Sequence, residues 1–324
     1  MAQWLLSYHP AGKTSLKSSL FNVPGRLGWC AMEIMGPLNL LYILYSTLDG
    51  DLSVLPLANQ LATALYVIHY FNRALVSPFL AAPSMSPIHV SIVVAAMAFN
   101  WVNSACLAGW VLGYRLDIGG FENTVVGGNG DADAAGGLLS QAIPFVGLGL
   151  FALGMAGNIY SERSLFRLRR EEGDKRSAKK SDTTTATTTD NSDGNKNKYS
   201  KVYVIPPKKG VFRYVLYPHY VFEWIEWLGF TLVGTAVFPA GSTMEKAAIN
   251  ATASPINLAP WLVPVAVVAD KLRVPLPLPA LVFVVNAVTN MLPHARWGRK
   301  WYVEKFGEEA VGNRGVALPG CPWM

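Results

Sequence analysis

Two acidic residues stand inside a strongly apolar stretch in the C-terminal half of the chain. Residues 203–230 begin as a basic segment with proline and glycine and continue as an aromatic helix that contains Glu223 and Glu226. A carboxylate in hydrocarbon is strongly unfavourable, so both acids are expected to face protein, water or a ligand. They are either partnered structural acids near a helix start or part of a cofactor site at a membrane surface.

Further polar side chains interrupt the other apolar runs or flank them. They are Glu33, His69, Tyr70, Arg73, Asn100, Asn103, Asn158, Glu162 and His219. Ionisable groups at membrane depth mark functional sites by default, and polar contacts between helices are the alternative for any one of them. A carboxylic acid and a tyrosine that face one cavity can both donate to a carbonyl, because burial favours the protonated acid. Arginines at the edge suit phosphate through bidentate pairing.

Motifs for several other chemistries are absent from the sequence. No GxGxxG opens a βα unit and no P-loop is present, which excludes the soluble nucleotide-binding folds. Cys30, Cys106 and Cys321 are widely spaced and lie in no CxxC or Cys/His pattern. We therefore expect neither a disulfide framework nor a metal site.

The composition indicates an all-α, polytopic integral membrane protein. The 324 residues are 51% hydrophobic and only 15% charged, and long apolar runs recur along the chain. The net charge is +6, but the basic residues gather in a few loops, where they act as topology signals and candidate phosphate ligands. No nucleic-acid partner is expected.

Six apolar runs predict about six transmembrane helices. They cover residues 27–48, 55–80, 88–114, 141–160, 215–238 and 278–292. A weaker run, 256–268, is too short to span comfortably and is predicted to be interfacial or re-entrant. Positive residues flank alternate ends of the runs, which predicts cytosolic termini and places the glycosylation sequon 250–252 in the lumen.

Four regions follow from these runs. Residues 1–28 are a cytosolic N-terminal segment, 29–160 form helices around a substrate cavity, 161–202 are a cytosolic loop, and 203–324 carry cofactor-binding motifs. Within the loop, the composition from about 173 to 197, which includes a Thr-rich insert, predicts disorder. The acidic, Gly-rich connector 115–138 is predicted to be a flexible loop.

Five separate motifs, which occur in order, resemble the steroid 5α-reductase family of membrane NADPH-dependent reductases. They are VPGRLGWCAMEIMGP at 23–37, LYVIHYFNRALVSP at 65–78, GMAGNIYSERSLFRLR at 154–169, the pattern YxIPxxxG…YxxxPxYxxEWIEWLG at 203–229, and WYVEKFGEE at 301–309. The resemblance implies hydride transfer from NADPH to the β-carbon of an α,β-unsaturated ketone, typically a 3-oxo-Δ4 steroid. It also implies a multi-pass protein of the endoplasmic reticulum membrane, with a sterol-like lipid substrate and a cavity open to the cytosolic side.

The resemblance further implies roles for single residues. Glu33 and Tyr70 would be catalytic, because they would bind the substrate carbonyl and stabilise the developing enolate. The implied cofactor-binding residues are Arg73, Asn103, Asn158, Glu162, Arg169, Tyr203, His219, Glu223, Arg299 and Tyr302.

The chain departs from the family pattern in several places. His219 stands where the family has asparagine, Glu162 where it has aspartate, and Gly298-Arg299 where it has a histidine pair. Met1 lies shortly before the run that matches the family's second helix, so no counterpart of the first helix is expected.

Two other activities stay open at this point. A polyprenal or long-chain enoyl thioester reductase would belong to the same superfamily. The Pro-x-Tyr-x-x-Glu segment at 218–223 also resembles isoprenylcysteine carboxyl methyltransferases, which use S-adenosylmethionine. Those enzymes do not need the pair Glu33 and Tyr70, so the presence of the pair favours reduction.

Overall fold

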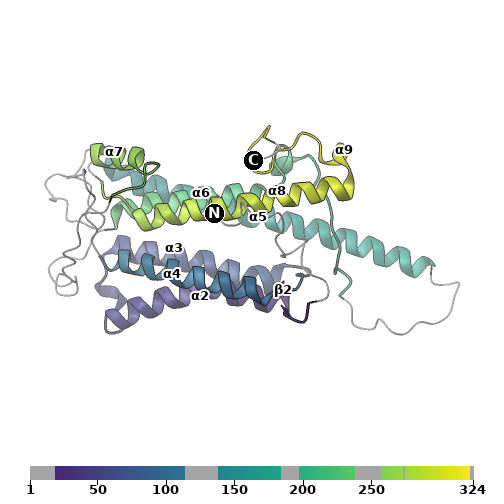
Figure 1. Cartoon of the computed structure of the whole chain (residues 1–324), viewed down its shortest axis with the longest axis horizontal. Coiled ribbons are helices and arrows are strands. Elements are labelled where there is room, and N and C mark those ends of the chain that lie inside the picture. The colour runs from purple at the N-terminus through teal and green to yellow at the C-terminus, as the bar shows by residue number, and fades with distance from the viewer. Residues whose placement is uncertain (1–18, 114–137, 184–196, 238–256, 273, 322–324) are drawn as a thin grey trace.

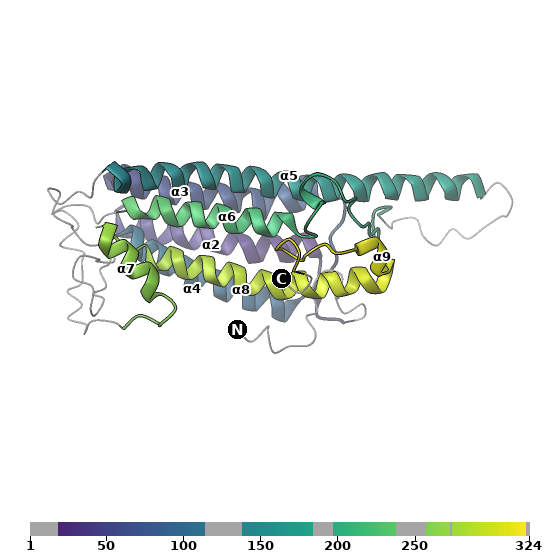
Figure 2. The same cartoon turned by 90° about the horizontal axis from the view of Figure 1, so that it is seen from above.

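The computed structural model describes residues 19–113, 138–183, 197–237, 257–272 and 274–321. Within these ranges the chain is a bundle of helices that lie side by side along the long axis of the molecule (Figures 1 and 2). The longer helices are α2 (Gly25–Thr47), α3 (Leu57–Phe71), α4 (Val90–Val111), α5 (Leu138–Thr183), α6 (Pro218–Val233) and α8 (Leu278–Phe306). The prediction of a mostly helical fold is confirmed.

Shorter elements close the ends of the bundle. They are the antiparallel pair β1 (Asn22–Val23) and β2 (Ile88–His89), the π-helix η3 (Asn72–Ala81), the 3₁₀ turns η2 (Leu52–Val54), η6 (Gly210–Phe212) and η7 (Gly234–Ala236), and the short helices α7 (Val263–Leu272) and α9 (Glu308–Val311). The strand pair joins the start of α2 to the start of α4 at one end. In Figure 1, α7 lies at the opposite end of the bundle.

Four helices are long and apolar enough to cross a membrane, and they indicate a membrane protein. They are α2, α4, α8 and the part of α5 from Gln141 to Lys179. The other two predicted runs are helical as well, because α3 continues into η3 and α6 into η7. Figure 2 places both of these helices within the same bundle. A total of six spans stays a prediction, as does a membrane position for α7.

Helix α5 is much longer than the predicted span 141–160, and in Figure 1 it extends well past the other helices. The prediction of disorder is therefore wrong for residues 173–183. Two surface pairs stabilise this part, since Arg176 binds Glu172 one turn away and Asp174 binds Lys198, each at 2.8 Å. The remaining Thr-rich residues, the sequon and nearly all of the Gly-rich connector lie outside the described residues, as does most of the N-terminal segment.

Helices α5 and α6 approach each other closely because glycines line their contact. A Cβ atom at position 154 would lie 2.6 Å from both the Cα of Glu226 and the carbonyl oxygen of Phe222. A Cβ atom at Gly229 would lie 2.6 Å from the carbonyl oxygen of Gly147. Such contacts between backbones are open only to small residues, and they bring the polar side chains of the two helices into reach of each other.

Replacing Gly154 by alanine is therefore expected to destabilise the bundle. The added methyl group meets backbone atoms, which cannot rotate away, so the free energy of unfolding should fall by about 1–3 kcal/mol. Gly149 provides the control on the same helix, since a Cβ there meets nothing within 4 Å. Gly149→Ala should be neutral or slightly stabilising, because alanine is the better helix former. Equal unfolding midpoints for the two variants in detergent would contradict this packing.

An aromatic core fills the space between α3, α6 and α8. Tyr66, Trp227 and Phe230 are almost completely buried. The rings of Trp227 and Phe283 meet edge to face with their centroids 4.5 Å apart, and the centroid of His69 lies 4.4 Å from that of Trp227. The core therefore fixes the face of α3 that carries the polar residues described below.

Candidate active site

Arg73 lies at the centre of a buried charged cluster. Its Nε is 3.4 Å from Glu33 Oε1, and its Nη1 is 3.3 Å from Glu223 Oε2. Asn158 donates to the same oxygen of Glu223 at 3.1 Å. Four elements, α2, η3, α5 and α6, thus contribute one side chain each. A guanidinium buried to this degree requires such counter-charges.

The π-helix η3 determines where Arg73 points. Ala82 N–H donates to the carbonyl of Ser77 five residues earlier, at 2.8 Å. In this pattern Pro78 would donate to the carbonyl of Arg73, but proline has no N–H. Trp29 supplies the missing donor, because its Nε1 lies 3.1 Å from that carbonyl oxygen. The same indole ring lies 5.0 Å below the guanidinium of Arg73. π-helical turns of this kind occur often at functional sites.

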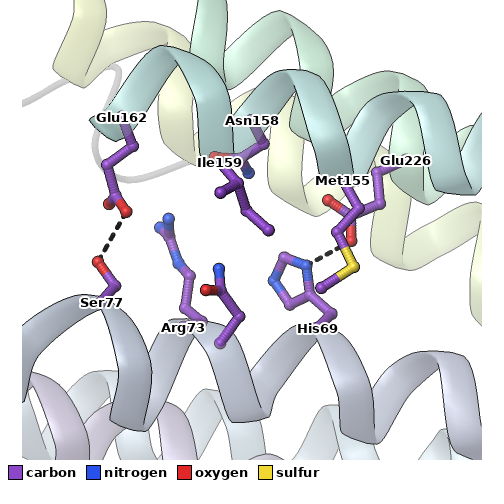
Figure 3. Close-up of a pocket in the computed structure, with 9 residues that line it drawn as sticks. His69, Arg73, Ser77, Met155, Asn158, Ile159, Glu162 and Glu226 are labelled. Atoms are coloured by element: carbon purple, nitrogen blue, oxygen red, sulfur yellow. Dashed lines mark hydrogen bonds and ion pairs between the residues drawn. The ribbon is translucent and has the colours of Figure 1, made fainter. Parts of the chain in front are cut away.

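Next to Arg73, a histidine joins α3 to α6. His69 Nδ1 lies 2.8 Å from Glu226 Oε1, and its Nε2 lies 4.0 Å from Glu223 Oε1. Glu162 accepts a hydrogen bond of 2.8 Å from Ser77 on the other side of Arg73. Figure 3 shows His69, Glu226, Glu162 and Ser77 around a small niche of about 10 Å³.

The two predicted catalytic residues lie on adjacent helices. Tyr70 is buried, and its hydroxyl donates to Asn100 Oδ1 over a long distance of 3.4 Å. Asn100 in turn donates to the carbonyl of Met32 at 2.7 Å, directly before Glu33. Asn100 therefore links the Tyr70 hydroxyl to the backbone directly before Glu33, and Arg73 pairs with the side chain of Glu33.

A larger cavity, of about 540 Å³, lies between α4 and α8. Its wall is mostly apolar and carries two amides, Asn103 and Asn286. The structure thus places Asn103 apart from Arg73, although it was expected among the cofactor residues. Asn103 lies beside the Tyr66 hydroxyl, and the ring of Tyr66 packs against Tyr70 at a centroid distance of 4.6 Å. The cavity therefore reaches the neighbourhood of Tyr70.

A second aromatic group lies where α6 begins and α8 ends. Tyr203 meets Trp301 edge to face at 4.9 Å between centroids. Tyr217 stacks on Tyr220 at 5.5 Å, and Tyr302 lies 6.3 Å from Tyr217. This second group therefore contains two of the predicted cofactor residues.

A third predicted cofactor residue, His219, lies at the start of α6 beside this group. Its ring lies 4.5 Å from that of Tyr220. Tyr220 is also within electrostatic range of Arg73, Glu162 and Glu223. The second aromatic group therefore adjoins the charged cluster around Arg73.

Two predicted cofactor arginines bind backbone carbonyls in this structure. Arg169 donates to the carbonyl of Val202 at 3.1 Å and to Ser84 Oγ at 2.7 Å. Arg299 donates to the carbonyl of Arg314 at 3.4 Å and to that of Gly312 at 3.5 Å. Both arginines therefore fasten the loops that carry the second aromatic group.

Arg314 fastens the C-terminal segment to the same loops. It donates to the carbonyl of Pro206 at 2.7 Å, and Leu216 N–H donates to the neighbouring Gly315 at 3.0 Å. Burial lowers the pKa of its guanidinium. Gly298 is explained by the same packing, because any side chain there would overlap the Tyr217 hydroxyl. A histidine at 298, as in the family pattern, would not fit.

Several residues of the site were not among those predicted. His69 and Glu226 had signals, since His69 precedes Tyr70 and Glu226 follows Glu223 by one helical turn. Asn100 was noted only as a polar residue within a span. Arg314 lies outside all five motifs and could not have been found from them.

Buried hydrogen-bond donors without an acceptor indicate whether a nucleotide cofactor fits this end of the bundle. Within the described residues, Trp224 Nε1 and Arg163 Nη1 are buried and have no hydrogen-bond acceptor. Buried donors are normally paired, and these two would suit the amide and phosphate oxygens of a nucleotide. The donor set therefore fits such a cofactor.

Comparisons with known proteins agree with this geometry. A profile described as 3-oxo-5-alpha-steroid 4-dehydrogenase matches residues 180–244. Steroid 5-alpha-reductase DET2 of Arabidopsis thaliana is 26% identical over 259 residues, which are 78% of this chain and 66% of that protein. The chain is therefore similar to proteins of the steroid 5α-reductase family. The resemblance carried by the five motifs is thereby confirmed.

Two further relatives extend this comparison. DET2 of Solanum lycopersicum is 24% identical over 257 residues, again 78% of this chain and 66% of that steroid 5α-reductase. The uncharacterized protein C9.08c of Schizosaccharomyces pombe is 28% identical over 321 residues, which are 95% of this chain and 89% of that protein. The similarity to the fungal protein thus extends over nearly the whole chain.

Proposed function

We propose that this protein reduces the C=C bond of an α,β-unsaturated ketone in a sterol-like lipid, with NADPH as the reductant. The observation that carries the proposal is that Arg73 joins Glu33 to Glu223, which also binds Asn158, while Tyr70 is linked through Asn100 to the backbone directly before Glu33. A carbonyl-binding pair is thus coupled to groups suited to a cofactor. Similarity to the steroid 5α-reductase family supports the same reaction class.

Tyr70 is the proposed donor to the substrate carbonyl. Its bond to Asn100 is 3.4 Å long and therefore weak, so a carbonyl oxygen can replace Asn100 as acceptor. A preorganised donor stabilises the negative charge that develops on this oxygen. Glu33 reaches the same region from α2, as a second donor when protonated and as the partner of Arg73 when ionised.

NADPH, when bound, would supply the hydride. Asn158, Glu223 and Arg73 are the proposed ligands nearest to Tyr70, and Tyr203 and Tyr302 would provide flat surfaces further out. Trp224 and Arg163 add the buried donors that still need acceptors. The basic segment beside this group supports a cytosolic opening, with six spans in the endoplasmic reticulum membrane.

The cavity between α4 and α8 is the proposed place of the lipid body. Its apolar wall suits hydrocarbon, and its two amides suit one or two polar substituents. A polyprenal is the second candidate substrate. Its support is that Val102 and Cys106 of the cavity wall are exposed on the outside of the bundle, where a long chain could leave the cavity.

The proposal is tested with the full-length protein purified in detergent. NADPH oxidation is followed with a 3-oxo-Δ4 steroid, a polyprenal and an enoyl thioester, and NADH and S-adenosylmethionine are offered separately. We expect NADPH oxidation that depends on the steroid enone and gives the saturated ketone. Methyl transfer from S-adenosylmethionine, or no oxidation with any of the three acceptors, would contradict the proposal.

A further inference from the structure

His69 and Glu226 form a buried pair beside the charged cluster around Arg73. Glu226 is fully buried and His69 is 5% exposed. Glu226 Oε1 lies 2.8 Å from His69 Nδ1, whereas its Oε2 has no hydrogen-bond partner among the described residues. An unpaired carboxyl oxygen in this position is unfavourable, so it needs a partner.

The niche in Figure 3 can hold a hydrogen-bond partner for this carboxyl oxygen. Its volume of about 10 Å³ is close to the minimum that holds one water molecule. Its polar lining comes from His69, Asn72, Arg73, Ser77, Asn158, Glu162 and Glu226. A water molecule needs two to four polar partners to be stable inside a protein, and this lining supplies them.

The charges that face the pair favour a shared proton. Glu223 on α6, Glu33 on α2 and Glu162 on α5 all lie near Arg73, which is the permanent cation within ion-pair distance of Glu223 and Glu33. Tyr70 and Tyr220 are the neutral titratable neighbours. With Glu226 the acids outnumber this cation, and histidine is the side chain that takes up a proton near neutral pH.

The reduction itself needs such a proton. The hydride and its electron pair form the C–H bond at the β-carbon, and the π electrons move to the carbonyl oxygen. One proton must then form the C–H bond at the α-carbon, so each turnover consumes one proton from solvent. Tyr70 gives its proton to the carbonyl oxygen, and the enol that forms loses this proton to solvent when the α-carbon is protonated. Tyr70 must then be reprotonated, and the net uptake remains one proton per turnover.

We propose that His69 and Glu226 hold this proton and return it to Tyr70, and that water in the niche recharges them. The inference rests on the proposed function. His69 directly precedes Tyr70, and their rings meet edge to face at 5.1 Å between centroids. The pair would act through Tyr70 without touching the substrate.

Glu226→Gln is the first test, because glutamine keeps the size and the hydrogen-bonding ability of the side chain but cannot carry the proton. We expect kcat to fall about a hundredfold, at the lower end of what general acid–base groups contribute. KM and NADPH binding should change little. The solvent deuterium isotope effect on kcat should rise, and the decline of parent activity with rising pH should flatten in the variant.

Met155→Leu is the matched control, since Met155 lines the same niche with an apolar side chain of similar volume. It should leave the pH profile and the isotope effect unchanged. If Glu226→Gln does not fold, His69→Gln takes its place in the same measurements. A variant of either residue with the pH profile and isotope effect of the parent would overturn the inference.

A second readout needs no substrate. Infrared difference spectra of the parent protein across neutral pH should contain a band of the imidazole or carboxyl group of the pair that gains a proton, and Glu226→Gln and His69→Gln should both alter it. Absence of that band in the parent would also overturn the inference. A parent that reduces no enone, but shows the band, would contradict the proposed function and leave a proton-binding pair at this position.

Discussion

Replacing Tyr70 by phenylalanine is expected to lower kcat at least about a hundredfold while NADPH binding stays largely intact. Loss of one donor at a developing oxyanion removes roughly 2.7–4 kcal/mol of transition-state stabilisation. The folded state should change little, because the hydroxyl of Tyr70 makes a long bond to Asn100 and otherwise lies beside that of Tyr66. Turnover and the NADPH dissociation constant are measured on the same preparation.

Tyr66→Phe is the control for this prediction. Tyr66 lies one helical turn before Tyr70, is fully buried and packs against its ring. It should retain most of the turnover, because the hydroxyl of Tyr70, the proposed donor to the carbonyl, is unchanged. Near-normal turnover of Tyr70→Phe would remove this residue from the chemistry.

Replacing Arg73 by methionine is expected to lower the free energy of unfolding by about 3–5 kcal/mol, as found when one partner of a buried ion pair is removed. The change leaves the carboxylates of Glu33 and Glu223 buried without their shared cation. Thermal unfolding in detergent measures the loss. NADPH binding should weaken in the same variant, because Glu223 and Asn158 lose the charge that orients them.

Two further variants test whether the loss of stability comes from the buried charges around Arg73 and not from the removal of any arginine. Arg167→Met removes a cation whose side chain is 71% exposed, and it should change stability by no more than about 0.5 kcal/mol. The double variant Arg73→Met with Glu223→Gln should recover part of the lost stability, because one unpaired charge is removed as well. An Arg73→Met protein as stable as the parent would show that the cluster does not need this cation.

The sequence predicted most helices well because hydropathy alone decides them. Helices α2 and α4 begin and end within three residues of the predicted runs 27–48 and 88–114. The end of α5 was missed, because composition does not reveal that Lys198 pairs with Asp174 across a long connection. The π-helix at Arg73 was missed as well, since it depends on the donor that Trp29 supplies from another helix.

The residues of the candidate site also divide into those that the sequence placed correctly and those that it did not. Glu33, Tyr70, Arg73, Asn158 and Glu223 were predicted, and the structure brings them together. Which cavity an α4 residue faces depends on the rotation of that helix in the bundle, and sequence motifs do not contain this information. For this reason Asn103 was expected beside the cofactor but lines the larger cavity.

The arginines reveal a further limit of motifs. Arg169 and Arg299 were expected to bind the cofactor, and in the structure they hold backbone carbonyls of loops that come together only in the folded chain. A motif identifies a residue type at a position, whereas its partners come from segments distant in sequence. The unpredicted pair His69 and Glu226 joins α3 to α6 in this way.

The most direct test of the account is to follow the hydride itself. The purified protein is given NADPH that carries deuterium at the transferable position, together with a 3-oxo-Δ4 steroid in ordinary water. We expect one deuterium at the β-carbon of the saturated ketone and a proton from water at the α-carbon. A product without deuterium at the β-carbon, or an enone left unchanged while NADPH is bound, would contradict it.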